Sequence, residues 1–497
     1  MVWTINEQNF QASRTLTAVR VRNNHSVHQQ HVFELGLLLS LGLSSLAGFS
    51  VGFLAGLVPG LHMNNIAAAL TAYGSASVAV LGTLGAALGA GEGALLISCF
   101  ISAALIAHLF AESITSTYVG IPSEDVVSVL PAHRLAMAGL GSIAVRSSAD
   151  GALAGVIVSA VLLFPICVVM GPPLGIYEVL RKIMAFIIIF FSAVLLLSEG
   201  FSGLRCRPRA RSPLRKTMNA CVIFLLAGIL GTIVFRTNYY ACHIPDMPWL
   251  PGDFVPRSSL LLPMFAGLFG IPGLLLSFGS RTVYDIDRDS LGSIVHQARS
   301  GDFILSSVGG IIVGWLPGMT SGSAATLCVP TAGEVRQNND VRSSLRFIWL
   351  YSSISAAGAV FAVGALFVIG RARSGSMDAV AFFLGDDSMT SSMASNIVPI
   401  LSILLAMILS ALASHTVLVR FQPGFASLRR FLCSKELALA SLLFVASLSI
   451  VLTGTRGALL MATSVVLGLI PPLTGVRRIQ LMGCLLVPIA ILLLSML

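Results

Sequence analysis

Long apolar runs separated by short polar segments are the dominant pattern of this chain. A membrane-spanning helix needs about 20 mostly apolar residues, and most of the runs reach that length. The run at 303–316 is shorter and suits a half-helix. The pattern predicts an all-α polytopic membrane protein of about 11–13 membrane segments. The runs lie at about 33–58, 64–90, 93–119, 149–173, 183–203, 218–236, 258–280, 303–316, 343–370, 397–418, 436–454, 457–475 and 479–497.

Two of these runs close in the same motif. GFLAGLVPG at residues 52–60 returns as GIIVGWLPG at residues 310–318, with three glycines and the Pro-Gly pair in register. Proline supplies no N–H and glycine holds a helix poorly, so each pair predicts a broken or re-entrant helix. Broken helices at matching positions of two halves point to a transporter built from two structural repeats. Inverted and parallel arrangements of the repeats are both compatible with the sequence.

Composition supports a membrane protein. The 497 residues are 56% hydrophobic and 10% charged, with a mean hydropathy of +0.90, whereas soluble domains have about 25% charged residues. The net charge of +9 does not indicate nucleic-acid binding, because the basic residues lie in short loops between apolar runs. The densest loop, at 204–216, is predicted to be cytoplasmic by the positive-inside rule.

That loop divides the predicted organisation. We expect a polar and disordered N-terminal tail at 1–32 and a first membrane repeat at 33–203. The Arg-rich cytoplasmic linker follows at 204–216, and a second repeat with extra C-terminal helices fills 217–497. The proline-rich loop at 240–256 has few basic residues, which favours an external position.

Small polar residues follow both Pro-Gly pairs. The backbone N–H groups at the start of a helix carry partial positive charge and bind anions. We therefore expect the segments after the breaks to bind a small organic anion. The alternative is that each Pro-Gly pair is a surface turn and the polar residues only cap helices. The candidate binding residues are Pro59, Gly60, His62, Asn64, Asn65, Pro317, Gly318, Thr320, Ser321 and Ser323.

Two acidic residues are candidates for ion coupling. Glu112 lies four residues after His108, so both face one side of a helix. An ionisable group at membrane depth often marks a proton or ion pathway. Asp125 follows Pro122 near a second candidate re-entrant segment. The alternatives are an interfacial ion pair for Glu112 and a helix-capping role for Asp125. The coupling cation would be a proton or sodium.

Motifs for other chemistry do not stand out. The eight cysteines are scattered without metal-ligand spacing, so we expect no disulfide, metal or other cofactor. No catalytic signature is visible, and the lack of a phosphate-binding loop argues against an ATP-driven pump. A secondary transporter driven by an ion gradient is favoured. An intramembrane enzyme acting on a membrane-embedded substrate and a channel are the alternatives.

Over residues 33–497 the chain resembles the TctA-type large membrane subunit of tripartite tricarboxylate transporters, and most closely its stand-alone archaeal branch. The resemblance rests on the two Pro-Gly motifs, on residues 120–145, on GLFGIPGLL at 267–275 and on GRARSG at 370–375. It implies a multi-pass permease of the plasma membrane that carries a carboxylate. A longer Gly/Asn-rich region after the second Pro-Gly pair of the tricarboxylate carriers is missing here. Such carriers work with a small membrane subunit and a binding protein. A small membrane subunit and a homodimer both remain open for this chain.

Overall fold

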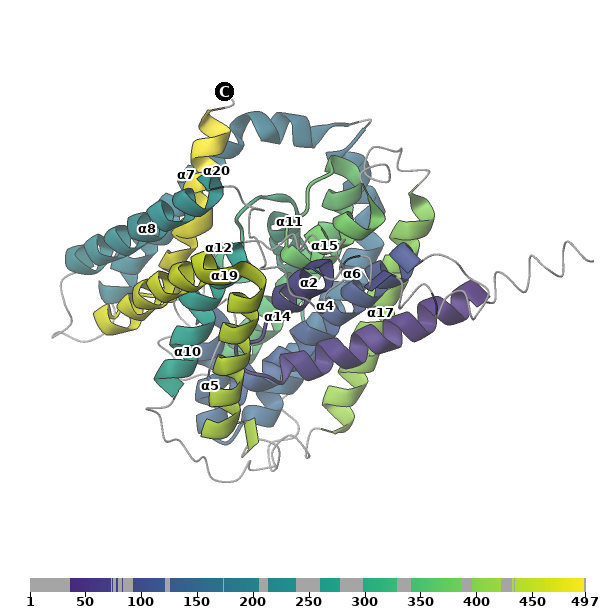
Figure 1. Cartoon of the computed structure of the whole chain (residues 1–497), viewed down its shortest axis with the longest axis horizontal. Helices are drawn as coiled ribbons and strands as arrows, with labels where there is room; N and C mark the ends of the chain where they lie inside the picture. The colour runs from purple at the N-terminus through teal and green to yellow at the C-terminus, as the bar shows by residue number, and fades with distance from the viewer. Residues whose placement is uncertain are drawn as a thin grey trace, which may run out of the picture.

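The computed structural model describes residues 36–72, 74, 77–78, 83, 93–120, 126–172, 174–204, 213–237, 260–277, 298–328, 341–385, 396–421, 431–432 and 434–495. These residues form helices and turns (Figure 1). In chain order, the helices are Gly36–Gly56, α2 (Met63–Ala72), α4 (Gly93–Tyr118), α5 (Val126–Met137), α6 (Gly141–Met170), α7 (Ile176–Leu204), α8 (Pro213–Arg236), α9 (Leu261–Phe265), the π-helical η1 (Ala266–Gly270), α10 (Ile271–Ser277), α11 (Ser300–Trp315), α12 (Ser321–Cys328), α14 (Val341–Ile369), α15 (Gly375–Leu384), α17 (Ile397–Arg420), α19 (Lys435–Thr474), the 3-10 helix η3 (Arg478–Met482) and α20 (Gly483–Leu494).

Eight of the described helices are long and apolar enough to cross a membrane, and four shorter apolar helices accompany them. The predicted all-α polytopic fold is confirmed. Helices suit a bilayer because they satisfy their backbone hydrogen bonds internally. The predicted segments at 436–454 and 457–475 are two helical stretches that share the label α19, and a kink at Gly454, which adopts φ 62°, divides them. That positive φ is accessible to glycine and interrupts regular helical geometry.

Two sets of helices follow the same order. The first set is Gly36–Gly56, α2, α4, α5 and α6, and the second is α11, α12, α14, α15 and α17. They pack crosswise, since α6 lies on α14 and α17 lies on α4. A serine crosses each contact: Ser147 donates to the Leu345 carbonyl (2.9 Å) and Ser410 to the Ala103 carbonyl (2.6 Å). This arrangement is expected of two repeats, which stay a prediction.

Close helix packing in both sets depends on the glycines of the repeated motif. A Cβ on Gly52 would overlap the backbone of Ala104 in α4, and one on Gly310 would collide with Ala357 in α14. Small residues let membrane helices approach closely. The in-register glycines therefore serve the same packing role, Gly52 against α4 and Gly310 against α14.

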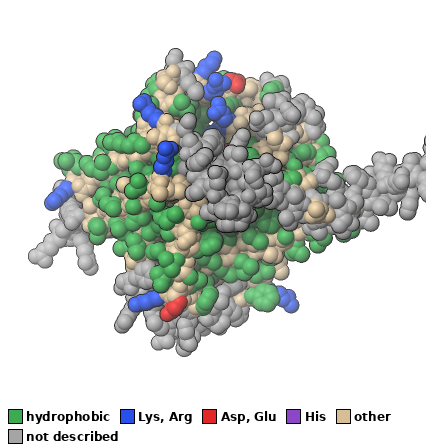
Figure 2. Space-filling view, in the orientation of Figure 1, with side chains coloured by type: hydrophobic (Ala, Val, Ile, Leu, Met, Phe, Trp, Pro, Cys, Tyr) green, Lys and Arg blue, Asp and Glu red, His purple; other side chains and the backbone are tan. Residues whose placement is uncertain are grey.

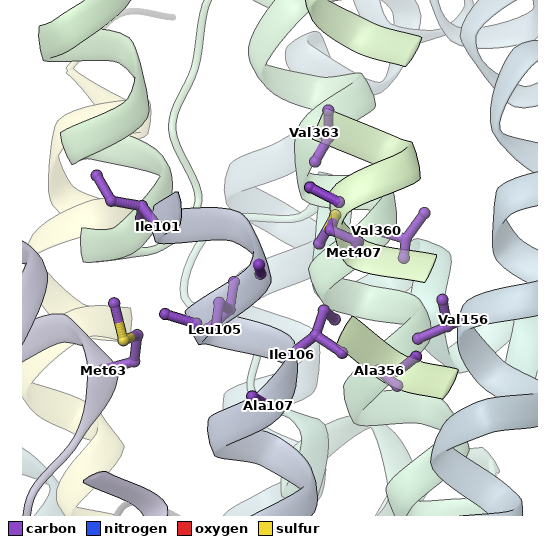
Figure 3. Packing of buried hydrophobic residues seen from close by; sticks show 14 of the residues in the cluster. Met63, Ile101, Leu105, Ile106, Ala107, Val156, Ala356, Val360, Val363 and Met407 are labelled. Atoms are coloured by element: carbon purple, nitrogen blue, oxygen red, sulfur yellow. The ribbon is translucent and has the colours of Figure 1, made fainter. Parts of the chain in front are cut away.

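The largest apolar core lies where the two sets meet. Met63 from α2, Ile106 from α4, Val156 from α6, Val360 from α14 and Met407 from α17 are all fully buried in it (Figure 3). Most residues of α4 and α14 are buried, which is typical of helices at the centre of a membrane bundle. This core holds α2 and α4 in fixed positions beside the first Pro-Gly pair.

A second bundle is formed by α7, α8, α9, η1, α19, η3 and α20, with an apolar core of its own. Glu199 near the end of α7 is almost completely buried, and its carboxylate accepts a hydrogen bond from Arg477 Nε at 2.6 Å. The ion pair joins the end of α7 to the turn between α19 and η3. It places the turn that contains Arg477 close to the end of α7, which precedes the Arg-rich linker at 204–216.

The outer surface of the described chain is strongly apolar. Large side chains are exposed on α7 and α8, including Phe190 and Leu214, at 64% and 72%. Figure 2 shows apolar side chains across much of the described face, with Lys and Arg gathered toward its upper and lower edges. So much exposed apolar surface would be unfavourable in water and suits contact with lipid.

Several predictions fall on residues outside the described part of the chain. These are the N-terminal tail at 1–32, most of the Arg-rich linker, the loop at 240–256 and Asp125. The domain boundaries at 33–203 and 217–497 also stay predictions.

Candidate functional site

The first Pro-Gly pair interrupts a helix. The Gly36–Gly56 helix is followed by a turn at residues 57–62, and α2 begins at Met63. Gly60 has φ 79°, a left-handed conformation that favours glycine. The His62 ring then caps α2, because its Nδ1 accepts a hydrogen bond from the Asn64 N–H at 3.1 Å. The His62 carbonyl accepts from the Asn65 N–H at 2.9 Å.

The second Pro-Gly pair has the same local geometry. Helix α11 ends at Trp315, Gly318 has φ 74°, and α12 begins at Ser321. Thr320 and Ser323 cap each other: the Thr320 N–H donates to Ser323 Oγ (2.9 Å), and the Ser323 N–H donates to Thr320 Oγ1 (3.3 Å). Thr320 stands three residues after Pro317, as His62 does after Pro59. The capping interpretation therefore describes both residues, and it is compatible with a bound anion.

Other candidate residues lie in the same two turns. Pro59, Asn65 and Ser323 are buried, whereas Ser321 and Pro317 are half-buried. A Cβ on Gly60 would lie 3.1 Å from Leu274 of α10, and one on Gly318 would lie 3.0 Å from Leu486 of α20. The second break is thus packed against α20 of the second bundle, and the first break against α10, which contacts α19 and η1 of that bundle.

The start of α15 contacts the first break. Asn64 Oδ1 accepts hydrogen bonds from the Ser376 N–H (3.1 Å) and from the Ser376 hydroxyl (3.2 Å). Ser374 caps α15 by accepting from the Met377 N–H at 3.2 Å. The contact brings the N-termini of α2 and α15 together. Both ends carry partial positive charge, so this junction favours an anion.

The loop before α15 also reaches the second break. Arg373 Nη2 donates to the Tyr177 hydroxyl at 3.1 Å, and the Tyr177 ring lies 6.4 Å from that of Trp315 at the end of α11. Burial lowers the pKa of the Arg373 guanidinium, while its contact with Tyr177 acts in the opposite direction. Arg373 Nε is buried without a hydrogen-bond partner among the described residues. A dehydrated guanidinium with an open donor suits a carboxylate.

Sequence reasoning missed Arg373, Ser376 and Tyr177 as site residues. A signal was present for two of them, because GRARSG at 370–375 contributed to the family resemblance and Ser374-Gly375 is a helix-start pattern. The contacts to Asn64 and Trp315 could not be read from the chain.

Glu112 is the candidate for ion coupling that lies within the described residues, and it lies beside His108. Its Oε2 is 3.8 Å from Nε2 of His108, and the His108 ring makes an edge contact with His62 at 5.3 Å. His108 is 1% exposed, and neither ring nitrogen has a hydrogen-bond partner in the described structure. Glu112 is thereby connected through His108 to the cap of α2.

Comparisons with known proteins agree with this architecture. A model described as the tripartite tricarboxylate transporter TctA family matches residues 43–483, which include both breaks and α15. An uncharacterized protein of Methanocaldococcus jannaschii is 25% identical over 331 residues, covering 66% of this chain and 69% of that protein. No solved structure matches the chain.

Proposed function

Because the chain belongs to the tripartite tricarboxylate transporter TctA family, we propose that it is a secondary transporter for a small carboxylate anion. The family consists of transporters rather than enzymes, and its members are membrane proteins. An ion gradient is the proposed energy source, since the sequence contains no recognisable phosphate-binding loop.

The observation that best supports an anion as substrate is the loop between α14 and α15. The first turn of α15, which follows this loop, contacts the first break through Ser376 and Asn64. The loop itself reaches the end of α11 through Arg373, Tyr177 and Trp315. A carboxylate held there would receive the Arg373 guanidinium and the N–H groups of helix starts. We propose that the breaks at Gly60 and Gly318 bound this site.

The two matched sets of helices are the proposed repeats of this transporter. In repeat-built transporters, relative movement of parts of the fold exposes a central site to each side in turn. The crosswise contacts of α6 with α14 and of α17 with α4 would stay fixed while the short helices α2 and α12 adjust.

Membership of the family indicates which kinds of partner protein this chain could have. Tripartite members are associated with a small membrane subunit and a solute-binding protein. The archaeal relative agrees with resemblance to a stand-alone branch. We propose that this chain transports without either partner, as a monomer or a homodimer.

The test is uptake by proteoliposomes that contain this chain alone. Radiolabelled citrate, succinate and acetate would each be offered with an imposed sodium gradient, with a proton gradient and without a gradient. Gradient-dependent accumulation of at least one carboxylate supports the proposal. Failure of every carboxylate under every gradient, with protein shown to be inserted and folded, would reject it.

A further inference from the structure

An open cavity lies between α4, α5, α6 and α14. Its enclosed volume is about 50 Å³, and it is open to the outside at its mouth. Hydroxyl groups and one carboxylate supply the polar part of its wall. The described lining residues are Leu109, Glu112, Ser113, Ser116, Thr117, Ala132, Ser148, Ala152, Ile348, Tyr351, Ser352 and Ser355.

The hydrogen atoms of several lining hydroxyls are already used. Ser113 Oγ donates to the Phe110 carbonyl at 2.6 Å, and Ser116 Oγ donates to the Ser113 carbonyl at 3.2 Å. Across the cavity, the hydroxyls of Ser148 and Ser352 share a hydrogen bond of 2.7 Å. A hydroxyl that donates to a carbonyl has only lone pairs left for a ligand. Ser113, Ser116 and whichever of Ser148 and Ser352 donates to the other therefore offer a ligand only acceptor lone pairs.

The charge of the cavity wall is negative, which also favours a cation. Among the described lining residues Glu112 carries the only charge, and its side chain is 22% exposed. Lone pairs and a carboxylate would repel the carboxylate substrate proposed above. They would stabilise a cation, because a buried charge needs an opposite charge and oxygen ligands.

We propose that this cavity binds a sodium ion through the Glu112 carboxylate and the hydroxyls of Ser113, Ser148 and Ser352. Calcium and magnesium sites usually use several carboxylates or carbonyl oxygens, whereas one carboxylate neutralises one sodium ion. Potassium-selective sites use rings of backbone carbonyls, and here the Phe110 and Ser113 carbonyls already accept hydroxyl hydrogens.

The cavity is joined to the first Pro-Gly break. Glu112 lies beside His108, and the His108 ring contacts His62, which caps α2. Thr115 on the same helix turn donates to the Gly56 carbonyl at 3.3 Å. A sodium ion that draws Glu112 toward the cavity would thus alter the packing of the residues that hold the start of α2. This coupling role rests on the proposed transport function, but the binding of sodium does not.

The test is binding of radiolabelled sodium to the purified full chain in detergent, in choline chloride and without any carboxylate. We expect saturable binding that excess unlabelled sodium displaces and potassium does not. Glu112→Gln and the cavity-filling Ala152→Leu should abolish it, and Ser352→Ala should weaken the affinity several-fold. Glu178→Gln and Ser50→Ala, which change an exposed carboxylate and an exposed hydroxyl, should bind like the wild type.

Thermal unfolding in choline chloride verifies that each variant is folded. Absence of sodium binding in the wild type, or unchanged binding in folded Glu112→Gln and Ala152→Leu, would overturn the inference. The outcome is separable from that of the proposed function. Sodium binding without carboxylate uptake would reject transport alone, and proton-driven uptake without sodium binding would reject the cation site alone.

Discussion

Asn64 and Ser376, far apart in the sequence, join the starts of two short helices. The side-chain oxygen of Asn64 accepts from both the N–H and the hydroxyl of Ser376, which is completely buried. Asn64 follows the first Pro-Gly break, and Ser376 lies just after the Arg373 loop. Through this contact, the repeated Pro-Gly motif lies close to the loop that carries the Arg373 guanidinium, the group proposed to bind an anionic substrate.

Substitutions of Asn64 should separate helix support from substrate contact. Asn64→Ala leaves a buried donor unsatisfied and should lower the free energy of unfolding by about 1–3 kcal/mol. Asn64→Asp keeps the acceptor and should retain stability, but its negative charge should weaken carboxylate binding. Thr71→Val on the same helix, where the hydroxyl bonds only within α2, is the control. Thermal unfolding and substrate binding measure the two effects. Wild-type carboxylate affinity in Asn64→Asp would argue against an anion at this junction.

Arg373 should matter for affinity more than for insertion. Replacing it with Gln removes a charge-assisted hydrogen bond, worth about 1.5–3 kcal/mol or roughly tenfold or more in affinity. Arg373→Lys should be only partly active, because lysine lacks the planar guanidinium. Arg181→Gln, at an exposed position on α7, should bind substrate normally. Equal affinities for all three variants would remove Arg373 from the site.

The two Pro-Gly breaks should be intolerant of branched residues. Gly60→Val and Gly318→Val combine an unfavourable positive φ with crowding against Leu274 and Leu486. Uptake should be lost while membrane insertion is kept. Gly475→Val introduces the same backbone strain where no atom lies within 4 Å, so it controls for strain alone. Normal uptake by both break variants would mean that the Pro-Gly pairs are only turns.

The Arg-rich linker is predicted to be cytoplasmic and the loop at 240–256 external. The Glu199–Arg477 ion pair is consistent with the linker and the turn at Arg477 lying on the same side of the membrane. In a background without accessible native cysteines, a cysteine at Ser212 should resist an impermeant thiol reagent in intact cells, whereas one at Asp253 should react. The reverse labelling pattern would invert the topology.

The helical membrane fold could be predicted because apolar runs of membrane length have few alternative structures. The interruptions at Gly60 and Gly318 were also visible, since Pro-Gly pairs disfavour a continuous helix. The second bundle was not expected, because its contacts join α7 and α8 to helices near the C-terminus. The division of α19 into the predicted segments 436–454 and 457–475 occurs at Gly454, whose positive φ interrupts the helix.

The candidate site was predictable only in part. His62 and Thr320 stand at equal distances from their prolines, and both became helix caps. Arg373 was recognised as part of a familiar motif but not as a site residue, because its relation to Tyr177 and Trp315 arises from tertiary packing. The hydroxyl cavity beside Glu112 depends in the same way on α4, α6 and α14 coming together.

Carboxylate counterflow measures alternating access of this chain most directly. Proteoliposomes are loaded with unlabelled carboxylate and diluted into labelled carboxylate, with no ion gradient and no accessory subunit. The wild type and Gly475→Val should draw in label transiently, and Gly60→Val and Gly318→Val should not. Two results would contradict a carboxylate transporter that works through its paired helix breaks. One is the absence of counterflow in folded wild-type protein for every carboxylate offered, and the other is counterflow in Gly60→Val and Gly318→Val equal to that of the wild type.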